Sequence, residues 1–192
     1  MKDKYDYMQG FNINSKADIA KTVAVFSAFT EGLQLFASFA ILLNFPRHNK
    51  MKGMGQIVTW SVRDETLHCN SMIKLFRTFI EENPEIWNEK LKKEIYDSCQ
   101  KIVSHEDAFI DLAFQMGPIE GLSADQVKKY IRWIGDRRLQ QLGLNPIYKV
   151  ESNPLTWLDT MLNAVEHMNF FDGRATEYSK ASTQGNWTEA FS

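Results

Sequence analysis

Three side chains in the first half of the sequence could bind a metal ion together: Glu31, Glu65 and His68. Glu65 and His68 stand three positions apart in a stretch with helical periodicity. Their side chains therefore leave the same face of a helix, about 5–6 Å apart at Cβ, and can hold one ion between them. By itself a Glu-x-x-His pair is a weak signal, because chance supplies it often and a packed structural histidine explains most examples.

Glu31 strengthens the case for a metal site. It is the single charged residue in the apolar stretch 23–45, where a carboxylate must be paired, protonated or bound to a metal. Dimetal sites in helical bundles use a lone Glu from each of two helices and a Glu-x-x-His from each of two others. His48, His105 and His167 have no Glu three positions before them. The chain therefore offers half of such a ligand set.

The elements that must position these residues are helices. Strand signals are nearly absent, and the 3.6-residue apolar period predicts helices over 15–44, 56–82, 84–116 and 123–143, with a shorter one near 157–168. Ser15 and Ser123 are suitable N-caps. Pro46 and the Gly117-Pro118 pair are suitable stops. The fold class is therefore all-α.

Composition limits the possible partners. The 192 residues include 22 basic and 24 acidic side chains, for a net charge of -2, so there is no basic field to bind a nucleic acid. Cys69 and Cys99 form no C-x-x-C pair and are expected to be buried thiols in a reducing compartment. The N-terminus resembles neither a signal nor a transit peptide, which favours a cytoplasmic location.

The stretch 23–45 is long enough to cross a membrane. However, the carboxylate of Glu31 and the amide of Gln34 lie near its middle, where lipid would make both costly. A helix that is apolar on every side can equally be the central helix of a soluble bundle. We therefore expect a bundle and no membrane partner.

Four separated motifs resemble one known family in order and spacing: TEGLQLFASFAILLNF, VRDETLH, YIRWIGDRRLQQLGLNPIY and NPLTWLD. From about Ser15 to its end, the chain is similar to the C-terminal half of class I ribonucleotide reductase small subunits. The resemblance implies a ferritin-like helical bundle with a dinuclear metal centre, Fe/Fe, Mn/Fe or Mn/Mn. With oxygen, that centre generates the oxidising equivalent that the large subunit uses to convert ribonucleotides into deoxyribonucleotides.

The resemblance also implies roles for individual residues. Glu31, Glu65 and His68 match three metal ligands of the family, and Asp64 matches an acid that links a metal-bound histidine to the radical-transfer path. Without the resemblance, Asp64 would be taken for a solvated helix charge. Tyr178 stands where the family carries a redox-active tyrosine that relays the radical between subunits.

The expected organisation has three parts. Residues 1–14 form an N-terminal extension, residues 15–171 form part of a ferritin-like domain, and residues 172–192 form a flexible tail that docks to the large subunit. The family's first half is absent, and with it the remaining metal ligands and the residue that stores the radical. The chain alone is therefore expected to be inactive.

Four interpretations remain open at this point. An N-terminal fragment of the small subunit could complete the bundle, and the assembled subunit would then form a homo-oligomer. Two copies of this chain could instead pair their half-sites into a homodimeric dimetal oxidase or ferroxidase. The chain could also be a non-catalytic module that binds the large subunit through its tail. Finally, it could be a helical domain that kept its core after losing its partner.

Overall fold

The computed structural model describes residues 7, 10–11 and 13–166. In this part of the chain every regular element is helical, and the β-type pairing it contains is an isolated bridge between Ile119 and Leu122. This confirms the all-α class. The elements are α2 (Lys16–Ala24), the π-helix η1 (Val25–Glu31), α3 (Phe36–Arg47), α4 (Lys52–Glu82), the 3-10 turn η2 (Pro84–Ile86), α5 (Glu89–Gln115), α6 (Ala124–Gln141) and α7 (Thr156–Glu166).

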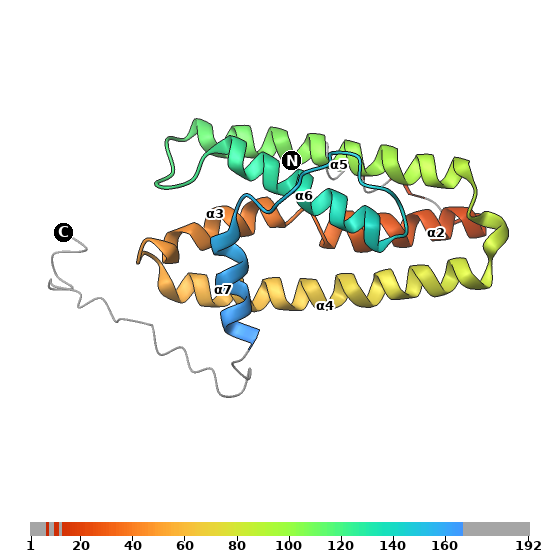
Figure 1. Cartoon of the computed structure of the whole chain (residues 1–192), viewed down its shortest axis with the longest axis horizontal. Helices are drawn as coiled ribbons and strands as arrows, with labels where there is room; N and C mark the ends of the chain where they lie inside the picture. Colours follow the sequence, from red (N-terminus) through yellow and green to blue (C-terminus); the bar gives the residue numbers. More distant parts are fainter. Residues whose placement is uncertain (1–6, 8–9, 12, 167–192) are drawn as a thin grey trace, which may run out of the picture.

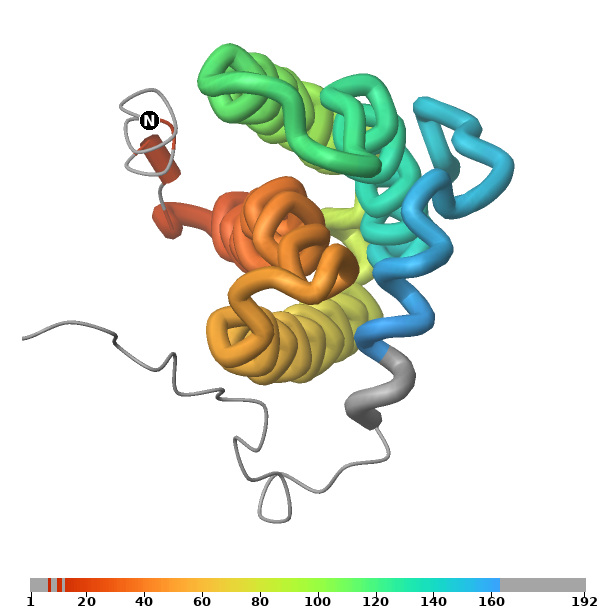
Figure 2. Tube along the Cα trace, turned by 90° about the vertical axis from the view of Figure 1, so that its left-hand side faces the viewer, coloured from red at the N-terminus to blue at the C-terminus, as the bar shows by residue number. Residues whose placement is uncertain are grey.

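The segments α2, η1 and α3 run end to end and form the centre of a bundle (Figure 1). α4 lies along one side of this row, and the pair α5 and α6 lies along the other, as the end-on view in Figure 2 shows. α7 crosses the other helices at a steep angle. The central row is thus covered from two opposite directions, which explains why it is the most apolar part of the chain.

The central row passes the length and composition test for a membrane-spanning helix over Lys16–Arg47, and half of its most apolar window is buried inside the bundle. Ala20, Ala24, Ala28 and Ala37 have no exposed surface. Small side chains at these positions let the neighbouring backbones approach closely. This burial fits the expected role of a central bundle helix.

The first helix is not continuous, although a single helix over 15–44 was expected. It becomes a π-helix at Val25, passes through a turn at residues 32–35 and restarts at Phe36. In the turn, the Gln34 N–H donates to the Phe29 oxygen five residues earlier (2.9 Å), and the Phe36 N–H donates to the Leu33 oxygen (3.0 Å). The apolar period of the sequence does not reveal this break.

Other helix ends agree only in part with the expected ones, since α3 runs through Pro46 to Arg47, past the expected stop. Ser123 and Gln126 form a capping box at the start of α6, where each side chain accepts from the other residue's backbone N–H. α4 begins at Lys52, earlier than expected, after Met51 in a left-handed conformation. α5 begins at Glu89, where the Asn88 side chain caps it, and residues 84–86 form the separate turn η2.

Candidate metal centre

Glu31, Glu65 and His68 come together between the central row and α4. Glu31 is the last residue of η1, and the other two stand in the middle of α4. One potential ligand atom from each residue lies within 4.8 Å of the other two. The His68 Nδ1 is 3.9 Å from the Glu65 Oε2, at the spacing of residues one helical turn apart.

The three candidate ligands differ in how far they are buried. The Glu31 Oε2 is fully buried and has no hydrogen-bond partner, whereas the side chain of Glu65 is 27% exposed and that of His68 is 63% exposed. A buried carboxylate oxygen that accepts no hydrogen bond costs free energy unless a cation compensates it. The carboxylates of Glu31 and Glu65 and the imidazole of His68 therefore form a set of donors that fits a transition-metal ion.

The site has a crowded inner wall. A Cβ on Gly32, the residue after Glu31, would lie 2.7 Å from the Cys69 Sγ, 2.7 Å from the Arg138 Nε and 2.5 Å from the Ala28 oxygen. Glycine is needed at this position because three neighbours occupy the space of a side chain. Glu31 is thus attached to a backbone that α4 and α6 hold closely.

Cys69 is a second residue of this inner wall, and its side chain has no exposed surface. Burial raises the pKa of the Cys69 thiol, the nearby carboxylates of Glu31 and Glu65 raise it further, and Arg138 opposes this shift. The thiol therefore stays protonated at neutral pH.

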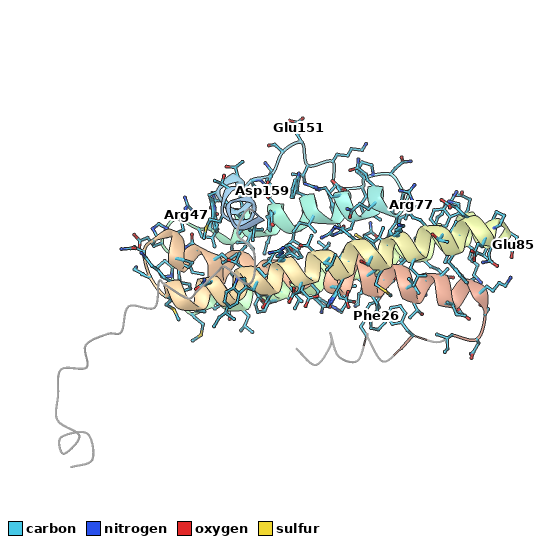
Figure 3. All side chains as sticks on the ribbon, turned by 90° about the horizontal axis from the view of Figure 1, so that it is seen from below. Phe26, Arg47, Arg77, Glu85, Glu151 and Asp159 are labelled. Atoms are coloured by element: carbon cyan, nitrogen blue, oxygen red, sulfur yellow. The ribbon has the colours of Figure 1, made fainter. Side chains whose placement is uncertain are left out.

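The outer side of the site is uncovered in the described part of the chain. Figure 3 looks onto α4, which carries exposed apolar side chains on both sides of the ligand pair. Ile57 is 61% exposed, Leu67 65% and Leu75 52%. Asp64 is also exposed. Positions 57, 64, 68 and 75 share one helical face, and we call this surface the open face of α4.

Sequence reasoning missed Gly32 and Arg138. Both lie inside the quoted motifs, but no local pattern links residues so far apart in the chain. Of the other expected sites, Tyr178 and the docking tail lie outside the described residues.

The family model for the ribonucleotide reductase small chain matches residues 1–154 of the sequence. The chain belongs to this family. The match starts at residue 1, before position 15 where the resemblance of the motifs begins. Residues 1–14 are therefore also covered by the family model.

Individual relatives agree with this assignment. A probable ribonucleoside-diphosphate reductase small subunit of invertebrate iridescent virus 3 is 54% identical over 171 residues, which cover 88% of this chain and 46% of the relative. Its counterpart in invertebrate iridescent virus 6 is 41% identical and covers 98% of this chain and 63% of the relative. The beta subunit of Chlamydia pneumoniae is 37% identical over 84% of this chain and 46% of its own length. The chain thus spans between about half and two thirds of these relatives.

Solved structures agree on the fold. A class I ribonucleotide reductase from Bacillus halodurans superposes with a TM-score of 0.77 at 22% identity, covering 83% of this chain and 58% of that one. The R2 subunit from Clostridium botulinum gives a TM-score of 0.77 at 21% identity, over 83% of this chain and 52% of that one. The expected ferritin-like helical bundle is therefore confirmed.

Proposed function

We propose that this chain supplies the C-terminal half of a ribonucleotide reductase small subunit and, with it, half of the ligands of a dinuclear iron or manganese centre. The observation that carries the proposal is the meeting of Glu31, Glu65 and His68 around a buried, unpartnered carboxylate oxygen. When bound, such a centre supplies the one-electron oxidation that starts the reduction of ribonucleotides to deoxyribonucleotides. The chain would thus be part of an oxidoreductase.

The chain's own residues would hold and orient this centre. Glu31 and Glu65 provide two negative charges, and His68 provides a neutral nitrogen donor. Asp64 stands four positions before His68 on the same face of α4. In the completed subunit Asp64 would accept a hydrogen bond from a metal-bound histidine and link it to the radical-transfer path. That pairing also gives a proton a defined position beside the metal-bound histidine.

The half-site needs a partner, because two bridged ions require carboxylates on both sides. An N-terminal fragment of the small subunit would cover the open face of α4, and its own ligands would then face His68. The assembled small subunit would form a homo-oligomer in the cytoplasm. It would dock to the large subunit through the C-terminal tail, with Tyr178 as the radical relay.

Complementation tests the metal site. The full chain would be mixed with the part of the invertebrate iridescent virus 3 relative that lies outside the match, and iron and manganese would be measured after gel filtration. We expect the complex to retain metal and Glu65→Ala to lose most of it. Glu81→Ala, an exposed carboxylate on the same helix, is the matched control. If Glu65→Ala keeps its full metal content, the ligand assignment is wrong.

Tyr178→Phe tests the proposed relay. The variant should assemble with its partners and bind metal normally, because phenylalanine keeps the ring and lacks only the hydroxyl that radical transfer requires. Nucleotide reduction by the complex with the large subunit should disappear. Unchanged turnover, measured beside a normal metal content, would show that Tyr178 is not the relay.

A further inference from the structure

Arg138, on α6, is a half-buried cation that forms no salt bridge with any residue in the described part of the chain. Its Nε donates to the Gly32 oxygen (2.9 Å), and its guanidinium donates to the Gln141 Oε1 (2.8 Å). The group also lies 5.8 Å from the centre of the Phe36 ring. Burial lowers the pKa of Arg138. Removing this charge from water costs free energy, and its two hydrogen-bond acceptors are neutral. A functional role for Arg138 would explain why the charge is kept there.

The Gly32 oxygen is available to Arg138 because the helix is broken there. In a regular α-helix the Phe36 N–H would donate to the oxygen four residues earlier, which is that of Gly32. Here the Phe36 N–H donates to Leu33 instead. The Arg138 Nε thus takes the place of the backbone donor that a continuous helix would have provided.

Glu31 stands at the boundary between the π-helix and the irregular turn. Each residue of an α-helix turns the chain by about 100°, so a change of hydrogen-bond register by one residue moves a side chain to another face. Glu31 immediately precedes the turn and faces Glu65 and His68 across the gap to α4. If the central row became a regular α-helix, Glu31 would leave this position.

We propose that Arg138 is a positioning residue for the ligand Glu31. By donating to the Gly32 oxygen, its guanidinium stabilises the broken helix relative to a regular one and keeps the Glu31 carboxylate directed at Glu65 and His68. The metal part of this inference rests on the proposed function. The positional part rests on the metal-free structure alone, so the two can fail separately.

Hydrogen exchange on the metal-free full chain tests the positional part. Arg138→Met should change amide exchange in peptides covering residues 29–36 by at least about tenfold, and Arg138→Lys should change it less. Peptides from α5 should be unaffected. The matched control is Arg137→Met, which removes the exposed neighbouring arginine that lies over Trp133. Should the methionine variant fail to fold, the lysine variant decides the result.

Two exchange results would overturn the proposal. One is unchanged exchange at residues 29–36 in both Arg138 variants. The other is a uniform acceleration in every helix, which would mean that Arg138 supports the fold in general and not this turn.

Cobalt(II) binding to the complemented complex provides a second readout, followed by visible absorption. Loss of Glu31 from the site should weaken binding at least tenfold in Arg138→Met and less in Arg138→Lys. If Arg138 acted only through its charge, removal of that charge near two carboxylates would strengthen cation binding, which is the opposite sign. Failure of the unmodified complex to bind cobalt would count against the proposed function, and the exchange result would still decide the role of Arg138.

Discussion

At Gly32 the central row lies close to side chains of both α4 and α6. The missing side chain of this glycine leaves room for the Cys69 thiol and the Arg138 guanidinium directly behind Glu31. The ligand pattern could be predicted from residue types and spacing, because Glu65 and His68 share a helix and Glu31 is isolated among apolar residues. The residues that support Glu31 could not be predicted, because each is ordinary until the fold brings it to Gly32.

Gly32→Ala should destabilise the fold and displace Glu31. The added methyl group would lie under 3 Å from three neighbours, and an overpacked site of this kind typically costs about 1–3 kcal/mol of unfolding free energy. Gly135→Ala is the matched comparison, since the nearest atom to its new Cβ would be 3.4 Å away, in the Tyr148 ring.

Urea unfolding measures the unfolding free energy of both variants. Gly135→Ala should be nearly neutral, because the gain in helix propensity of about 1 kcal/mol offsets the tighter packing. Equal stability of Gly32→Ala and the unmodified protein would show that the neighbouring atoms move aside to accommodate the methyl group at little cost.

At the scale of elements, local signals predicted where helices lie but not how they are interrupted. Ser123 capped its helix as expected because a capping box needs only neighbouring residues. At the break at residues 32–35, the Gly32 oxygen accepts a hydrogen bond from Arg138, which is contributed by α6. A periodicity analysis treats each segment alone, so it predicted one straight helix over 15–44.

The packing of α5 against α6 should make the protein sensitive to alkaline pH. Burial raises the pKa of the Cys99 thiol to about 12, and the Asp136 carboxylate raises it as well. Unfolding returns the thiol to a pKa near 9.0. The folded pKa is the higher one, so the stability from keeping this thiol neutral is complete below about pH 9 and is lost as the pH rises toward 12.

Urea unfolding at pH 8, 9 and 10 would measure this loss. The unfolding free energy should fall by about 1 kcal/mol per pH unit from this group once the unfolded thiol ionises. Cys99→Ala should show a shallower fall by that amount. The same slope in both proteins would assign the alkaline loss to other groups, such as Tyr148, whose pKa burial also raises.

At the scale of the whole molecule, the sequence predicted an incomplete metal site, and the described structure has three clustered candidate ligands with an uncovered outer side. That prediction needed only the sequence, because His68 alone among the four histidines has a Glu three positions before it. The identity of what covers α4 could not be predicted, because an apolar helical face accepts another fragment or a second copy equally well.

Native mass and metal content of the isolated chain separate these two possibilities. We expect the isolated chain to hold less than one tightly bound iron or manganese ion, because one wall of ligands is missing. About two metals in each homodimer would instead support the symmetric arrangement, with two Glu31 and two Glu65–His68 pairs around a twofold axis. Native mass spectrometry before and after addition of the complementing fragment gives both quantities.

The exposed side chains of Ile57, Leu67 and Leu75 have a consequence for the cell. Where this polypeptide is made without the segment that covers α4, these side chains remain in water and attract chaperones and proteases. Unassembled copies would then be degraded, and assembled ones would survive. The amount of the chain would follow the supply of its covering segment without any dedicated control of its synthesis.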